Sequence, residues 1–399
     1  MANEMITKLA TLFMNQESTD GTAAAGVAGD AILARDINVD GGPEMNAREY
    51  QGLPGQLGAV PGAKSASLSF TTELKGNGTT TLPEIDEILT GCFGTVVAAD
   101  LDSTISGTSG STTVWDVLAA TNGTVGNMVM LETGTADTYE CAGPIKVVDT
   151  GAAPDDLTVA LAAVNGGYAT DGKKVKEMRT WQIKLPPPAV NSLTADVYRS
   201  TVGGGADRLD RIVGCRGDFS MSSPAAGQIP AWAFKFEGWS VSRVTTGTRP
   251  TPTYDTANPK AAIAQIFRVD GTYTNAFDIE ISLGASLAVK KSQNADGGTY
   301  GVLHVSYTPK FKFKIHPAYT SVSYFTDWEA GTPHTLLFQV GNALYGTWAF
   351  YGPRAVFDKV SQPSDNGVDC WEVEGHFAEQ NDASPTSATL DAALYLGLG

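Results

Sequence analysis

The sequence predicts a mainly β protein with two sandwich- or barrel-like β units, each flanked by one short helix, and a small β-domain inserted in the first unit. Several segments alternate apolar and polar residues, which is the period of a half-buried strand. The 44 glycines and 20 prolines among 399 residues indicate many turns. Long strands, a short helix and further strands follow in both halves, and Trp232-Ala233-Phe234 weakly echoes Trp348-Ala349-Phe350. These patterns predict a divergent duplication.

The order of these signals divides the chain into parts. Short strand signals recur about every ten residues within 100–172, as in a small β-barrel, and the flanking pieces fit one interrupted unit. A Pro-rich stretch separates the two larger units. The predicted parts are an N-terminal arm (1–30), the first β unit (31–99 and 173–245), the inserted domain (100–172), a linker (246–262) and the second β unit (263–399).

The clearest local pattern covers residues 64–92 of the first unit. A strand is expected there because Ala66, Leu68 and Phe70 share one face. Pro83 suits the first position of a helix, where its missing N–H costs no hydrogen bond, and Gly91 is expected to end that helix. A comparable helix is expected within 319–330 in the second unit.

Composition limits the classes of function. The formal charge is −16, from 27 basic and 43 acidic residues, so the chain is not expected to grip nucleic acid by neutralising phosphates. No apolar run is long enough for a transmembrane helix, so no membrane anchor is expected, and the N-terminus lacks a signal-peptide pattern. The cysteines form no C-x-x-C pair and are expected to be buried thiols: Cys92, Cys141, Cys215 and Cys370.

No catalytic, cofactor-binding or metal site is predicted, and the protein is not expected to be an enzyme. Residues 36–41 match the first half of a calcium loop, but Ala47 stands where the bidentate Glu is required. Lys310, Lys312 and Lys314 form a basic face on one strand. That face has three interpretations: a solvated strand face, a contact with acidic groups of a neighbouring subunit, or a grip on DNA.

Two short segments together resemble a family signature. The first runs from the strand through a glycine turn into the helix, and the second is a G-x-R-G turn that enters another strand. The matching residues are Glu73, Leu74, Lys75, Gly76, Gly78, Thr79, Pro83, Ile85, Asp86, Ile88, Leu89, Gly91 and Cys92, followed by Gly214, Arg216 and Gly217. These segments, with the strand at 231–238, resemble the tail tube (major tail) proteins of long-tailed bacteriophages.

The resemblance implies a structural virion protein that polymerises into stacked rings around a conduit for double-stranded DNA. The implied partners are further copies of the chain and other tail proteins, namely the tape measure, terminator and tail tip, and DNA passes through without specific binding. The implied location is the virion tail, after assembly in the host bacterial cytoplasm. A duplicated chain would build a ring from three copies, as a pseudo-hexamer, instead of six.

The arm and the Gly/Pro loop at 52–62 are then expected to bridge successive rings, and the insertion to face outward, because it would otherwise block the conduit. Two alternatives stay open. The chain could be another virion β-protein, such as a tail terminator, fibre or decoration protein, or a β-rich enzyme that acts on glycans.

Overall fold

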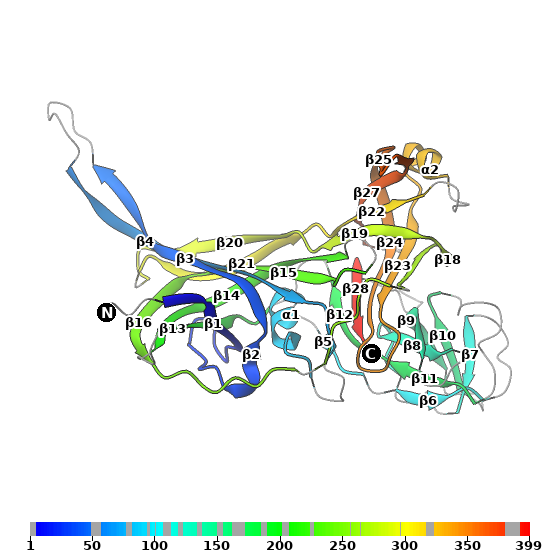
Figure 1. Ribbon diagram of the computed structural model, residues 1–399, viewed down its shortest axis with the longest axis horizontal. Helices are drawn as coiled ribbons and strands as arrows, with labels where there is room; N and C mark the ends of the chain where they lie inside the picture. Colours follow the sequence, from blue (N-terminus) through cyan, green and yellow to red (C-terminus); the bar gives the residue numbers. More distant parts are fainter. Residues whose placement is uncertain are drawn as a thin grey trace.

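The computed structural model shows a mainly β protein with antiparallel sheets, one of them curved into a half-barrel, and two α-helices in the described part of the chain (Figure 1). The residues that the structure describes are 5–48, 57–76, 82–93, 96–99, 101–106, 113–118, 123–133, 138–149, 155–161, 172–184, 190–201, 207–223, 227–255, 257–263, 265–295, 297–316, 323–379 and 392–399.

The elements fall into three groups along the chain. The first half contributes β1 (Met5–Gln16), η1 (Ala28–Asp30), β2 (Ala31–Ile32), β3 (Ala34–Arg48), β4 (Leu57–Glu73), α1 (Asp86–Phe93), β5 (Val96–Val97), β12 (Arg179–Ile183), β13 (Leu193–Thr201), β14 (Asp207–Ser223), β15 (Ala231–Gly238) and β16 (Ser240–Gly247). Between β5 and β12 lie β6 (Asp102–Thr104), β7 (Val114–Val117), β8 (Met128–Glu132), β9 (Tyr139–Asp149), β10 (Asp155–Val159) and β11 (Lys174–Glu177). The second half contributes β17 (Ile266–Val269), β18 (Thr272–Tyr273), β19 (Ala276–Ser282), β20 (Ala285–Lys291), β21 (Thr299–Tyr307), β22 (Lys310–Ile315), α2 (Tyr324–Ala330), β23 (His334–Val340), β24 (Trp348–Ser361), β25 (Ser364–Asp365), β26 (Val368–Asp369), β27 (Trp371–Phe377) and β28 (Leu394–Leu398).

The two halves have the same strand order. The first half is ordered β2–β1–β13–β14–β15–β4–β3, and the second β18–β17–β23–β24–β27–β22–β19. In each half a further strand, β16 or β28, pairs with the N-terminal part of the long strand β14 or β24. A short helix follows the matching strands β4 and β22.

The Trp-Ala-Phe echo does not mark equivalent positions in that order. Trp232 lies on β15 and Trp348 on β24, whereas the counterpart of β15 is β27. The two indole rings instead pack edge to face in one core, with centroids 5.6 Å apart. The echo is therefore a feature of core packing.

Two pairings join the halves, that of β12 with β28 and that of β14 with β19, and the second of them makes one continuous sheet. The end of β14 pairs with β19, so β4, β15, β14, β19, β22 and β27 lie side by side. Because directly opposed residues share a face, Met221, Ile281 and Phe311 line up on the core face. The row beside them, Ser222, Glu280 and Lys312, lies on the opposite, polar face.

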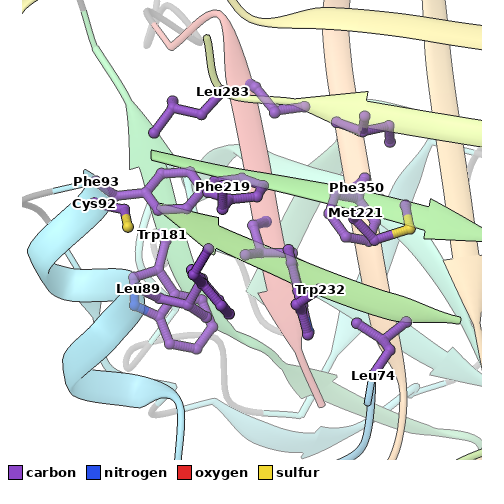
Figure 2. Close-up of a cluster of buried hydrophobic side chains, with 14 of the residues drawn as sticks. Leu74, Leu89, Cys92, Phe93, Trp181, Phe219, Met221, Trp232, Leu283 and Phe350 are labelled. Atoms are coloured by element: carbon purple, nitrogen blue, oxygen red, sulfur yellow. The ribbon is translucent and has the colours of Figure 1, made fainter. Parts of the chain in front are cut away.

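The core lies beneath this sheet, where α1 packs against β14. Figure 2 shows Leu89 and Phe93 of the helix beside Trp181, Phe219 and Trp232. The Phe93 and Phe219 rings stack with centroids 5.1 Å apart. Burial of such aromatic side chains is the main source of stability for a sheet covered on one face.

The helix begins and ends later than the sequence predicts. Pro83 lies in the preceding turn, where its carbonyl accepts a bond from the Asp86 N–H, and α1 continues to Phe93. Gly91 therefore lies inside the helix and does not end it. A Cβ atom on Gly91 would come within 2.5 Å of the Leu193 side chain, so close helix–strand packing explains this glycine. In the second half the helix prediction is confirmed, and Gly331 ends α2 with a φ of 63°.

Three expected irregular segments have regular or fixed structure instead. Residues 5–16 of the expected arm form β1, which pairs with β13 of the same chain. Residues 57–62 of the expected loop belong to β4, in a hairpin with β3 that projects far from the body (Figure 1). Within the expected linker, the backbone of Asp255 contacts Lys75 and Glu84, so the segment is strapped along the first half.

The inserted segment has its own sheet and core. Its strands run β6–β11–β8–β9–β10–β7, so the sheet extends over residues 102–177, slightly beyond the predicted 100–172. Trp115, Leu131 and Ile145 belong to a separate apolar cluster inside it. A second cluster, which includes Tyr139, Leu337 and other residues, joins β8 and β9 to β23, β24 and β28. The insertion is therefore packed firmly against the second half.

The four cysteines are buried and free of disulfides, as predicted. In the described part of the chain, neither helix has the length and apolar character that crossing a membrane requires.

Candidate functional site: the polar face and its hairpins

The polar face of the continuous sheet carries opposite charges on neighbouring strands. Lys312 Nζ lies 2.8 Å from Glu372 and 3.1 Å from Glu374 on β27, and Lys314 Nζ lies 2.9 Å from Asp278 on β19. The hydrogen bond to Glu372 raises the pKa of Lys312, and the bond from Lys312 lowers the pKa of Glu374. Both groups are therefore held in their charged forms.

This pairing changes the interpretation of the predicted basic face. Two of its three lysines meet carboxylates of the same chain, and Lys310 lies opposite Ser282 and His376 in the register. The face presents alternating charges, and it is not a positive patch that would neutralise phosphates. The surface of this face forms a groove of about 630 Å³. Its lining includes Glu280, Lys310, Lys312, Asp358 and Glu374.

The strand–turn–helix residues hold the end of β4 against other segments. Lys75, which is buried, lies with Nζ 3.3 Å from a Glu84 oxygen and 2.9 Å from the Asp255 carbonyl. Burial raises the pKa of Glu84. Asp86 accepts two hydrogen bonds from Arg179, of 2.5 and 2.9 Å, which clamps α1 to β12.

The other residues of this motif are structural. A Cβ atom on Gly76 would come within 2.1 Å of the Tyr345 carbonyl oxygen, so only glycine fits where β4 meets the β23–β24 loop. Glu73 ends β4 opposite Ala231. Gly78 and Thr79 lie outside the described residues. The remaining members are buried: Leu74, Pro83, Ile85, Ile88, Leu89, Gly91 and Cys92.

The G-x-R-G residues lie together where the hairpin formed by β20 and β21 covers β14. Gly214 adopts a φ of 67°, which favours glycine, and donates its N–H to the buried Glu17 at 2.9 Å. Arg216 donates to the Val302 carbonyl at 2.7 Å, and His304 Nε2 lies 2.9 Å from the Gly217 carbonyl. The second segment of the signature therefore anchors a hairpin from the second half of the chain.

The first segment of the signature reaches the same hairpin. The Tyr307 hydroxyl donates to the Cys92 carbonyl at 2.9 Å, at the end of α1. Asp218, next to the G-x-R-G turn, accepts a hydrogen bond from the Ala285 N–H. Both signature segments thus converge on β20 and β21, which the sequence places more than 60 residues farther along the chain.

The apolar residues of β21 are only partly buried. Alternation groups Leu303 and Val305 with Tyr307, yet the first two side chains are 44% and 53% exposed, while Tyr307 and the polar His304 are buried. Burial lowers the pKa of His304 to about 4, so the ring is neutral near pH 7. Polar anchoring of the hairpin by β14 therefore takes precedence over the apolar pattern.

Sequence reasoning missed two buried acidic residues that connect distant elements. Glu17 follows β1 and accepts hydrogen bonds from Ser192, Thr194 and two backbone N–H groups. Glu140 of the insertion pairs with Arg268 of β17. An acidic residue within an otherwise apolar strand is the available signal for Glu140, because a buried charge requires a partner. For Glu17 the sequence offers no such contrast.

A scan against models of protein families and a search of curated proteins both find no match for this chain. Within the described ranges, no group of three or more His, Cys, Asp and Glu side chains is arranged to hold a metal ion.

Proposed function

We propose that the chain is a structural virion protein of the tail-tube type, which polymerises into stacked rings around a conduit for double-stranded DNA. The observation that carries this proposal is the repeated strand order of the two halves, together with the β14–β19 pairing that merges them into one sheet. Two such units per chain suit a ring of three copies with pseudo-sixfold symmetry.

The polar face of the sheet supports a conduit wall. Antiparallel sheets often leave one face wet, and a ring of them closes the exposed edges. DNA carries about one negative charge per 1.7 Å of duplex, so a basic wall would retain it. On this face Lys312 and Lys314 are paired with carboxylates, and the chain has a net charge of −16. Such a wall suits the passage of DNA without binding it.

The position of the insertion supports its placement on the outside of the tube. Its strands β8 and β9 pack against Leu337, Ala349, Tyr351 and Tyr395 of β23, β24 and β28, and none of these four residues lines the groove on the polar face. Figure 1 shows the insertion on the side of the sheet away from the β20–β21 hairpin. With the polar face toward the lumen, the conduit stays open.

Electron microscopy of the purified protein tests the proposal. We expect long hollow tubes whose cross-sections show three chains per ring. Rings of six chains would contradict the two-unit wall. Short rings or trimers that never stack would favour a terminator or decoration protein, and a fibrous rod without a channel would count against a conduit.

A further inference from the structure

We infer that the projecting β3–β4 hairpin docks on a second copy of this chain, in the groove that β14, β19, β22, β24 and β27 line. The inference rests on the self-assembly proposed above and names the surfaces that make the contact. It starts from a difference between the halves. Each half sends out a hairpin at the same place in its strand order. The second-half hairpin lies on β14, β15 and β4, whereas the described part of the first-half hairpin contacts the chain near its base, where Glu44 pairs with Lys291.

The residue register shows that the two hairpins are equivalent. In the first half, one row across four strands consists of Asp40, Ser67, Glu237 and Arg216. In the second half, the corresponding row consists of Ser282, Lys310, His376 and Val356. In each half the row contains the residue just after the long strand stops pairing with its other neighbour. Cys215 is the last residue of β14 that pairs with β13, and Ala355 is the last residue of β24 that pairs with β23.

Both hairpins leave the sheet at the same number of residues beyond this row. Two residues beyond the row, Gly42 and Gly284 occupy matching positions, and both have φ in the region that favours glycine. Beyond Gly284 the hairpin becomes β20–β21 and packs back onto β14, β15 and β4. Beyond Gly42 the β3–β4 hairpin continues away from the body, on the side opposite β22 and β27 (Figure 1).

The projecting hairpin has the properties of a segment that needs a partner. All residues of 43–48 and 58–61 are exposed, so both faces of this two-stranded ribbon are in contact with solvent. Such ribbons are at best marginally stable alone in water. Met45 and Val60 are 59% and 46% exposed and lie on adjacent pairs of the ribbon. Because adjacent pairs face opposite sides of the ribbon, docking of either face would cover one of these two apolar side chains.

The groove matches the surface that β20–β21 covers in the first half. Arg216, which holds that hairpin, corresponds by register to Val356, and Asp218 corresponds to Lys359, because Asp358 lies at a bulge in β24. The groove is lined by Asp358 together with Lys310 and Glu374, from the counterparts of β4 and β15. Because the β3–β4 hairpin points away from this groove within one chain, a second copy must supply it. Such a head-to-tail contact produces a ring when it closes.

Disulfide trapping between two variants tests the contact. Ala59 precedes Ser67 by as many residues as Val302 precedes Lys310, and Val302 contacts Arg216, the counterpart of Val356. Docking therefore places Ala59 beside Val356, which lies two residues from Asp358 of the groove, so Ala59→Cys and Val356→Cys are made in separate chains and mixed. The native cysteines are buried and do not interfere. The control pair is Ala59→Cys with Leu118→Cys, which lies on the insertion and is 67% exposed.

Docking raises the effective concentration of the paired thiols to about millimolar, so at about micromolar protein we expect mixed disulfides to form on the order of 1000-fold faster than in the control. A second variant replaces residues 44–62 by an Asn-Gly turn. We expect it to keep its circular dichroism spectrum and unfolding temperature but to lose self-association.

Assembly that proceeds with control-level cross-linking, or with the shortened hairpin, would overturn the docking and leave the proposed function intact. Efficient cross-linking into closed rings that never form tubes would support the docking and contradict the conduit. A chain that stays monomeric without cross-links would overturn both.

Discussion

Acid should release the β20–β21 hairpin from β14, because His304 must be neutral to stay buried. Its pKa is lowered by burial from about 6.5 to about 4, and undocking restores the ordinary value. The docked state therefore binds fewer protons than the undocked state between these values, and docking weakens as the pH falls through this window. From pH 7 to pH 5 the cost is about 1.8 kcal/mol, a roughly 20-fold increase in the undocked population.

Hydrogen exchange at the amides of residues 299–307, corrected for the intrinsic effect of pH, measures this release. His304→Gln cannot take up a proton and should remove the extra opening at pH 5. His376→Gln serves as the matched control, because His376 is 42% exposed and lies outside the hairpin. Equal pH dependence in the wild type and His304→Gln would refute the role of this ring.

Two further predictions concern stability. Gly217→Ala should destabilise the protein by about 1–3 kcal/mol, since its Cβ would come within 2.3 Å of the Phe236 ring, whereas Gly58→Ala, with open space around it, should leave the unfolding temperature almost unchanged. Glu140→Leu should destabilise the contact between the insertion and the second half by about 3 kcal/mol because it leaves Arg268 buried without this carboxylate. Limited proteolysis of the insertion reports that loss, and unchanged cleavage would contradict it.

The sequence predicts strands well where one face lies on the core. Alternation along β15 correctly groups Trp232, Phe234 and Phe236 on a buried face, because that strand has a single apolar side. In β21 the same pattern groups Leu303 and Val305 with Tyr307, and of these three only Tyr307 is buried. Alternation separates two faces but does not say which one another segment will cover, and here the anchors of His304 come from β14, 87 residues away along the chain.

Long-range pairing also limits what could be predicted of the candidate site. The spacing of Lys312 and Lys314 indicates a common face, but their carboxylate partners lie on β19 and β27. Only the register of those strands shows that the charges cancel. Likewise, local signals predict that Gly91 ends the helix. The structure shows that glycine is needed there because the side chain of Leu193 packs closely against the helix.

The β14–β19 pairing has a mechanical consequence. The two halves share backbone hydrogen bonds from Ser220 to Ser223, not merely a side-chain contact. A hinge between the halves would have to break this ladder and open the aromatic core beneath it. The pair therefore moves as one stiff block. In any assembly of this chain, flexing is confined to the contacts between copies, and the number of flexible joints is set by the number of chains and not by the number of repeated units.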